Sequence, residues 1–569
     1  MKKNIKVSGI LFLVAVIIIL PQLAQHALIL GPDALFHFNR FFDTEQQIAH
    51  GNLQYFITTY GFSQSGRIVN ALYGPYIAYF NGFLLYILKS WFWYQIISSI
   101  FVCFISGVSM YYLLIRNKIN YYYALFIAVL YMLTYGVTAW ITTQQFIAWG
   151  AMLVPLGLAV ATRLISAPQK PINVVEMSLV TTLFIQTHVL SSLILIFIYI
   201  IFFVISLFRV TDKYKLWRSL VVAIGITSLL TSNIWVILLA AYHGNHLMSP
   251  FLNLFPLKFG VINFPTDNKL LYPFAIIFIL QIGTLFFKIT NVSFLNRVVT
   301  ILGAVLLICT LPILPWNYLF THLPFISILQ FPFRFFPFAE ALLLLGFGLT
   351  LNNLTLAKPV NNISKLIMFI IATLSILLVQ NLVYTASLNW SSPNNIIASK
   401  TNVSYILNGE KLRQRFYSKN LGAALKVIWK PTSDYLPVKQ GAVILHPYNE
   451  YNMQIAKNTH NKKTATKTGL RVSWMATKEN YHNTGVVKYA NDRILINGQT
   501  PTKRQYYTTK IGTLMVRSSR GHNVVTITYK PSLSMRLGLL INLISWLIFG
   551  GYLLLLGLKK WSQKNAHHF

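Results

Sequence analysis

Apolar runs long enough to cross a lipid bilayer recur along this chain and constrain its fold more than any other feature. A transmembrane helix needs about 20 predominantly apolar residues. Such runs begin directly after MKKNIK and return as late as Leu537–Leu558. Hydrophobic residues make up 55% of the chain and charged residues only 10%. This pattern predicts an all-α polytopic membrane protein.

The positions of Lys and Arg predict which helix ends face the cytoplasm, because cytoplasmic loops are enriched in these residues. The lysines of MKKNIK place the N-terminus inside, and Arg116 and Lys118 after the span Tyr94–Ile115 must also lie inside. The first span therefore puts Gly31–Asn70 outside, and an odd number of crossings must lie between Asn70 and Arg116. The apolar stretch Tyr73–Leu88 is accordingly expected to be an interfacial or re-entrant helix rather than a span.

About twelve crossings satisfy the charges, with both termini in the cytoplasm. The first span is expected to be an uncleaved helix despite its resemblance to a signal peptide. The expected spans are the run that ends near Leu20, Tyr94–Ile115, Tyr121–Thr138, Gln145–Thr162, Val174–His188, Leu190–Phe208, Leu220–Ala241, Tyr272–Phe287, Val298–Leu314, Phe336–Leu351, Leu366–Tyr384 and Leu537–Leu558.

Three regions follow from this topology. Residues 1–386 are expected to form a transmembrane domain with an external loop at 29–70, and residues 534–569 the last span with a basic cytoplasmic tail. Residues 387–533 are hydrophilic and expected outside the membrane. Within them, GVVKYANDRILINGQT and LMVRSSRGHNVVTITYKP alternate apolar and polar residues around turn formers, which predicts hairpins of a mainly β domain. This basic domain carries no catalytic motif and is expected to pack on the membrane domain or to bind an anionic polymer.

The segment Gly31–Gly51 is unusual because it holds three of the 12 acidic residues of the chain, namely Asp33, Asp43 and Glu45. Gly31-Pro32 favours a helix start, where the helix dipole stabilises the Asp33 carboxylate, and Gly51 favours a helix end. At about 100° per residue, Asp33, His37 and Arg40 share one polar face. The segment therefore predicts a helix that holds a polar site just above the bilayer.

Other ionisable or polar residues recur at the expected external ends of the spans. His188 lies in IQTHVLSS at the top of a helical hairpin, and Gln330, Arg334 and Glu340 lie in LQFPFRFFPFAE, where a loop re-enters the membrane. Ionisable groups inside or beside a membrane are costly, so each is a candidate functional residue. For Arg334 the alternative is a cation that reaches the membrane interface, and for His188 it is a hydrogen bond to a neighbouring helix.

Several functional classes are not supported by the sequence. The net charge is +35, but Lys and Arg are spread over loops and the C-terminal region, which disfavours nucleic-acid binding and favours anionic lipids or polymers. No nucleotide-binding motif is present. Cys103 and Cys309 both lie in apolar spans and indicate neither a disulfide framework nor a metal site.

A carboxylate that faces a cation beside a membrane suits one particular chemistry. In glycosyl transfer from a lipid phosphate sugar, a carboxylate takes the proton of the acceptor hydroxyl. An arginine or a divalent metal neutralises the departing phosphate. The external face of this chain collects groups of both kinds.

The PDALFHFNRF segment after a single span, the aromatic stretch that follows it, and the later LQFPFRFF loop resemble the YfhO-like bacterial membrane proteins. They also resemble the related family described as "6-pyruvoyl-tetrahydropterin synthase-related, membrane", and the architecture is similar to GT-C glycosyltransferases. The resemblance covers roughly the first 390 residues. It implies that Asp33 is the catalytic base, that His37 and Arg40 support it, and that Arg334 contacts phosphate.

The chain departs from GT-C types that carry an adjacent acidic pair, because Asp33 is followed by Ala34. A divalent metal would then depend on Asp43 or Glu45, so no cofactor is assigned. No His cluster has the spacing of a closed zinc site. The substrate-binding residues expected besides Arg334 are Asp43, Glu45, His188, Gln330 and Glu340.

The sequence thus predicts a plasma-membrane glycosyltransferase that moves a sugar from a polyprenyl-phosphate carrier to a wall polymer such as lipoteichoic acid, a lipid or a protein. The expected partners are that donor and an anionic lipid or polymer acceptor. Two alternatives stay open. One is a transporter or flippase of lipid-linked sugars, for which related halves and midplane sites would be expected. The other is a non-catalytic scaffold for cell-envelope synthesis, in which the β domain is the working part.

Overall fold

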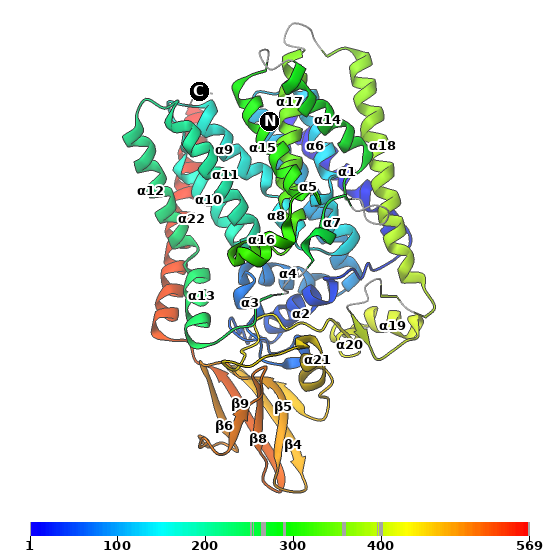
Figure 1. The fold of residues 1–569 in the computed structure, drawn as a ribbon, viewed down its shortest axis with the longest axis vertical. Coiled ribbons are helices and arrows are strands. Elements are labelled where there is room, and N and C mark those ends of the chain that lie inside the picture. The colour runs from blue at the N-terminus through cyan, green and yellow to red at the C-terminus, as the bar shows by residue number, and fades with distance from the viewer. Residues whose placement is uncertain are drawn as a thin grey trace.

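A bundle of long helices occupies most of the molecule, and a β-sheet region stands at one end of it (Figure 1). Both chain termini lie at the opposite end. The structure is a computed structural model that describes residues 2–250, 253, 255–262, 269–287, 292–354, 360–394, 396–397 and 402–566.

The bundle is built from helices that are apolar on the faces they turn outward. In the described ranges, eight segments are long and apolar enough to cross a membrane, or nine when the bent pair α12 and α13 counts as one span. The chain is therefore a multi-pass helical membrane protein. The bundle helices are α1 (Lys2–Ala24), α5 (Trp91–Arg116), α6 (Tyr121–Met132), α7 (Tyr135–Thr143), α8 (Ile147–Ala151), α9 (Val154–Ser166), α10 (Val174–Thr187), α11 (Val189–Leu207), α12 (Lys213–Leu230), α13 (Ser232–Gly244), α14 (Tyr272–Phe287), α15 (Phe294–Thr310), α17 (Phe336–Leu354), α18 (Asn362–Leu388) and α22 (Leu533–Ala566).

Each span expected from the sequence corresponds to one of these helices or to a run of two. Eight of them meet the length and hydropathy needed for a crossing, and a ninth is the α12–α13 pair, bent by 65°. The other three are α10, α14 and α15, which are apolar but shorter. By length and hydropathy, the described structure supports eight or nine crossings, fewer than the twelve expected from the sequence.

The bend between α12 and α13 is held by the last helix of the chain. Asn542 Nδ2 donates to the Leu230 carbonyl at 2.8 Å, and Trp546 Nε1 donates to the same oxygen at 3.1 Å. Ser232 Oγ donates to the Gly538 carbonyl at 3.0 Å. A bend interrupts the helical hydrogen-bond ladder, so α22 supplies partners for groups that the bend releases.

Three helices lie across the end of the bundle nearest the β region: α2 (Ala34–His50), α3 (Val69–Leu72) and α4 (Pro75–Leu88). Asp33 is the N-cap residue of α2, and Gly51 ends it in a left-handed conformation with φ 64°, as the sequence predicts. Helix α4 lies directly on α2, as shown by the hydrogen bond that Thr44 Oγ1 of α2 donates to the Ala78 carbonyl of α4 at 2.9 Å. A side chain at Gly82 would clash with Thr44, since its Cβ would stand 2.2 Å from Oγ1.

The C-terminal region covers α2 from the other side with short helices and one short strand pair. Trp91 Nε1 donates to the Leu421 carbonyl at 3.0 Å, and the Phe416 ring lies 6.4 Å from that of Phe38. As a result the residues of α2 from Ala34 to Phe41 are all buried. The covering elements are α19 (Gly409–Phe416), α20 (Gly422–Leu425), α21 (Pro447–Tyr451), the π-helical turn Asn452–Ala456, and the strand pair β1 (Val403–Ser404) and β2 (Ile428–Trp429).

Strands β3 to β9 lie at 462–529, within the range 387–533 expected for the β domain. Two sheets, with strand orders β3-β4-β9-β6 and β5-β8-β7, share one apolar core. The strands are β3 (Lys462–Ala465), β4 (Gly469–Ala476), β5 (Tyr481–Val487), β6 (Asp492–Ile496), β7 (Tyr506–Thr508), β8 (Thr513–Arg517) and β9 (Gly521–Tyr529). The remaining short elements of the described chain are α16 (Trp316–His322), η1 (Phe62–Gln64), η2 (Pro256–Phe259), η4 (Pro324–Leu329), η5 (Pro332–Phe335) and η6 (Asn389–Ser391).

The two hairpins expected in this domain are wrong, although their strands are present. β5 and β6 lie in different sheets, and so do β8 and β9. Alternation turns one face of each strand toward a core, and in this domain that core lies between the two sheets. The turns after Val487 and after Arg517 are therefore corners between sheets.

The β region is attached to the loop that follows α2. Val487 N–H donates to the Ser65 carbonyl at 2.8 Å, and Lys463 Nζ donates to the Ser63 carbonyl at 2.9 Å. Gln54 Nε2 donates to the Lys467 carbonyl at 2.8 Å. The β region is thus docked on the membrane domain rather than only tethered to it.

Candidate functional site

Helix α2 places Arg40 at the centre of a polar cluster. The Arg40 side chain is fully buried, with Nη2 donating to the Tyr73 carbonyl at 3.0 Å and Nε donating to Asn70 Oδ1 at 3.2 Å. Its guanidinium also lies over the Phe146 ring, 5.3 Å from the centroid. No carboxylate of the described residues forms an ion pair with it. Burial lowers the pKa of Arg40 to about 10, so it remains a cation at neutral pH.

Asp33 stands one residue before α2, at the edge of this cluster. Its Oδ1 lies 2.6 Å from Lys430 Nζ, and its side chain is 38% exposed. The second oxygen, Oδ2, has no hydrogen-bond partner in the part of the chain that the structure describes. Asp33 therefore combines one fixed oxygen with one that a small molecule could reach.

His37 lies one helical turn after Asp33 and is buried among aromatic rings. It stacks on Phe146 with centroids 4.7 Å apart, and its Nδ1 lies 3.4 Å from Arg40 Nη1. Burial and the positive charges of Arg40 and Lys430 lower the pKa of His37 well below its usual value. The imidazole is therefore neutral at neutral pH.

Arg334 approaches the same place from η5, directly before α17. It lies within electrostatic range of Asp33, Tyr73 and Tyr435. One terminal nitrogen donates to Gln330 Oε1, while its buried Nε has no partner among the described residues. A buried, unpaired N–H is costly, and a bound oxyanion would satisfy it.

His188 completes this set from the junction of α10 and α11. Its Nδ1 accepts a hydrogen bond from the Ser191 N–H at 3.2 Å and so caps α11. It lies within electrostatic range of Arg334 and Arg40. Six residues thus form one group, which we call the α2 cluster: Asp33, His37, Arg40, His188, Arg334 and Lys430.

The C-terminal region also supplies a second acidic group beside the α2 cluster. Tyr73 donates its hydroxyl hydrogen to Asp434 Oδ2 at 3.0 Å. Burial and the Asp434 carboxylate raise the pKa of Tyr73 well above its usual value, so the phenol keeps its proton. The buried Arg67 donates to the Asp434 carbonyl. Asp434 thereby joins the C-terminal region to α3.

Lys430 and Asp434 are the residues that the sequence analysis missed. They lie in KPTSDYLP, a segment of the external region to which no site was assigned. The available signal was that Asp434 is one of only 12 acidic residues, the same argument that singled out Asp33.

Asp43 has a different environment from Asp33, although both belong to the same segment. Its Oδ1 accepts the backbone N–H groups of Thr59, Tyr60 and Gly61 at 2.8, 2.8 and 3.1 Å. Its Oδ2 accepts from the side chains of Gln47 and Asn70 at 2.7 and 3.3 Å. Burial raises the pKa of Asp43 to about 6 despite these bonds. Asp43 holds the loop after α2 in place.

Glu45 and Glu340 also lie apart from the α2 cluster. Glu45 is buried, and its Oε2 accepts from Gln46 Nε2 at 2.8 Å. Glu340 is buried within α17, and its two oxygens accept the N–H groups of Tyr135 and Gly136 at 3.0 and 3.1 Å. Glu340 therefore stabilises the start of α7, where backbone N–H groups lack helical partners.

The donor set does not fit a divalent metal held by Asp33 together with Asp43 or Glu45. A lysine ammonium occupies one oxygen of Asp33, and five donors occupy Asp43. Over the described ranges, no group of three or more His, Cys, Asp or Glu residues is placed to bind a metal.

The fold and this site define a class of protein, namely a multi-pass membrane protein with a cation-rich polar cluster at one end of its bundle. Three cations, Arg40, Arg334 and Lys430, accompany a single carboxylate, Asp33, so the cluster favours an anionic ligand. Comparison with protein-family models and with curated proteins gives no match to this chain. The α2 cluster is therefore the basis for proposing a function.

Proposed function

We propose that this chain is an integral membrane glycosyltransferase that uses a polyprenyl-phosphate sugar and works at the outer face of the plasma membrane. The observation that carries the proposal is that two groups lie within electrostatic range of each other: the partly exposed Asp33, and Arg334, whose buried Nε has no partner among the described residues. The first suits a proton acceptor and the second a phosphate ligand. The proposed GT-C-like architecture and YfhO-like kinship rest on the sequence resemblance alone.

In the proposed reaction, the hydroxyl oxygen of the acceptor attacks the anomeric carbon of the sugar. Asp33 Oδ2 takes the proton of that hydroxyl. The bond between the anomeric carbon and the phosphate oxygen breaks, and the electron pair leaves with the phosphate. Arg334, Arg40 and Lys430 stabilise the charge on the departing group. Neutral His37 keeps the Arg40 side chain in place through its contact at 3.4 Å.

The proposal includes a topology of twelve spans with both termini in the cytoplasm. It is supported by the eight long apolar helices, the bent pair and the three shorter helices. The shared location of the two termini, opposite the β region, also supports it (Figure 1). Since the lysines of MKKNIK mark the terminal end as cytoplasmic, the α2 cluster would lie outside, where an anionic lipid or polymer acceptor is available.

The decisive experiment compares Asp33→Asn with the wild type and a gene deletion in the host cell. We expect the variant to lose the same envelope sugar as the deletion, by at least about 100-fold in transfer rate, while its membrane level is unchanged. Glu479→Gln is the matched control, because Glu479 also pairs with a cation, Arg517 at 3.1 Å, but on the surface of the β region. A normal sugar composition in Asp33→Asn cells would refute the catalytic role and favour transport or scaffolding.

A further inference from the structure

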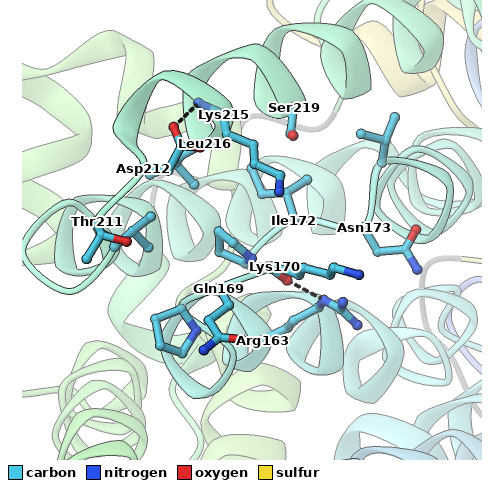
Figure 2. A pocket seen from close by; sticks show the side chains of 14 residues that line it. Arg163, Gln169, Lys170, Ile172, Asn173, Thr211, Asp212, Lys215, Leu216 and Ser219 are labelled. Carbon is cyan, nitrogen blue, oxygen red and sulfur yellow. Dashed lines mark hydrogen bonds between the residues drawn. The ribbon is translucent and has the colours of Figure 1, made fainter.

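A second basic site lies at the other end of the bundle, near the chain termini. The end of α9, the loop before α10 and the start of α12 enclose a cavity of about 370 Å³ (Figure 2). Three cations line it, Arg163, Lys170 and Lys215, together with one acid, Asp212. The cavity shares no residue with the α2 cluster, so a ligand bound in it would serve a different purpose.

The single acid of this cavity does not neutralise its lysines. Asp212 Oδ1 accepts the backbone N–H of Lys215 at 2.9 Å and thereby caps α12. Figure 2 shows the side chains of Lys170 and Lys215 extending into the space that the lining residues enclose. Neither ammonium group has a hydrogen-bond or ion-pair partner within the described ranges. Both charges are therefore available to an anion.

Arg163 shapes the cavity and also adds charge to it. Its Nε donates to the Lys170 carbonyl at 3.0 Å, which fixes the loop that forms one wall (Figure 2). Its Nη1 lies 4.0 Å from Glu176 Oε2, and that oxygen is closer to Arg116, at 3.4 Å. Arg163 is thus only weakly neutralised and can contribute to anion binding.

The cavity combines these charges with an apolar wall. The lining residues without polar side chains are Pro168, Pro171, Ile172, Val174, Val210 and Leu216. On α12, which contributes Leu216 to this wall, Tyr214 and Trp217 are 78% and 51% exposed. Exposed Tyr and Trp are enriched at the level of lipid headgroups. The cavity therefore lies where a headgroup phosphate and the first part of its glycerol would reach it.

We propose that this cavity binds the phosphate group of an anionic membrane lipid. Basic cavities between membrane helices on the cytoplasmic side are suited to such headgroups. Lys170 and Lys215 would contact the phosphate oxygens, and the apolar wall would contact the glycerol. Because no residue of the α2 cluster takes part, this proposal holds or fails independently of the proposed glycosyl transfer.

The test is native mass spectrometry of the purified full chain with equimolar phosphatidylglycerol and phosphatidylcholine. We expect the wild type to retain phosphatidylglycerol selectively. The double variant K170Q/K215Q should bind it more weakly by about fivefold for each lysine. The matched control is K213Q/R218Q, which removes the same charge from exposed residues of α12 that do not line the cavity.

Each outcome supports or refutes the proposed lipid-binding site. Loss of phosphatidylglycerol selectivity in K170Q/K215Q alone supports the proposal. Equal loss in both double variants would assign the preference to the general positive charge of this end, and no loss in either would remove the site. Titration with inorganic phosphate distinguishes the source of the ligand, because displacement of the lipid at comparable concentrations would make this a free-phosphate site. Unchanged melting temperatures check that both variants are folded.

Discussion

The two halves of helix α2 show how one short segment can hold carboxylates of opposite character. At the N-cap that opens the first half, Asp33 has one ion-paired oxygen and one without a partner in the described structure, and it is partly exposed. In the second half, Asp43 is fully buried and receives five hydrogen bonds. The rarity of acidic residues singled out both equally. What separates them is the number of donors that the protein itself supplies.

This difference gives a practical criterion for a membrane protein with few acids. A carboxylate whose oxygens are all satisfied by the fold contributes to stability, because its removal leaves buried donors without partners. A carboxylate with an open oxygen beside cations contributes little to stability and is available for a ligand. The criterion predicts how stability should respond to substitution along α2.

The largest effect is expected for Asp43→Ala. Five donors lose their acceptor, and at about 1 kcal/mol each the unfolding free energy should fall by about 5 kcal/mol. Asp33→Ala should change it by no more than about 1 kcal/mol, because a partly exposed ion pair contributes little. Thermal unfolding of both variants in detergent measures the contrast. Similar losses of unfolding free energy for the two variants would contradict the distinction between Asp33 and Asp43.

Asp492 extends the comparison to a buried carboxylate with few donors. It accepts the Tyr489 N–H through Oδ2 at 2.7 Å, while Oδ1 is buried without a partner among the described residues. Burial raises the pKa of Asp492 to about 7. Between its unfolded pKa of about 4 and this value, the folded state keeps a proton that the unfolded state releases. Stability should therefore fall as pH rises through this window.

Asp492→Asn should remove this pH dependence. Between pH 5 and pH 8 the wild type should lose about 3 kcal/mol through this group, and the variant should be the more stable protein at pH 8. Melting temperatures of both proteins at the two pH values provide the measurement. If the two curves ran parallel, Asp492 would have to be ionised throughout, with an acceptor role like that of Asp43.

Lys430→Gln tests the ion pair of the first half. Its side chain is 22% exposed and that of Asp33 38%, so we expect a loss of at most about 1 kcal/mol. Arg517→Gln, which breaks the surface pair with Glu479, serves as the control and should cost no more. A much larger loss for Lys430→Gln would show that Lys430 is needed to attach the C-terminal region to α2.

The smallest effect is expected for Glu45→Gln. Burial raises the pKa of Glu45, and the hydrogen bond it accepts from Gln46 can be kept by the amide oxygen. Unfolding free energy at neutral pH should change by no more than about 0.5 kcal/mol, in the stabilising direction. A clear loss of melting temperature would place Glu45 with Asp43 as a structural acceptor.

Local signals predicted the local structure well. Gly51 ends α2 as expected, because a helix end depends on residues within one turn of it. The helix begins at Ala34, after the expected start at Gly31-Pro32, and the Asp33 side chain forms no capping hydrogen bond. Apolar runs also located the long helices, because hydropathy depends only on the residues within each segment. The pairing of β strands was predicted wrongly at Val487 and Arg517, since alternation shows which side of a strand is apolar but not which strand lies beside it.

The candidate site could be predicted only in part. His37 and Arg40 lie near Asp33 because they belong to the helix that Asp33 precedes. His188 and Arg334, which the sequence also singled out, lie in the same cluster. Lys430, which is 397 residues from Asp33, could not be found, because no local pattern encodes a contact over that distance. The role of Asp43 was also hidden, since it depends on the backbone of the loop at 59–61.

The bend between α12 and α13 has a consequence for how the protein is made. The Leu230 carbonyl accepts a hydrogen bond from Gln186 Nε2 at 3.3 Å and a shorter one, at 2.8 Å, from Asn542, 312 residues later in the chain. An unsatisfied backbone group in lipid costs several kcal/mol, and synthesis proceeds from the N-terminus. Until the final helix is made, the bend therefore has only the longer bond from Gln186 at Leu230. The last helix thus completes the hydrogen bonding of the bend, and a chain truncated before it would hold the bend less firmly.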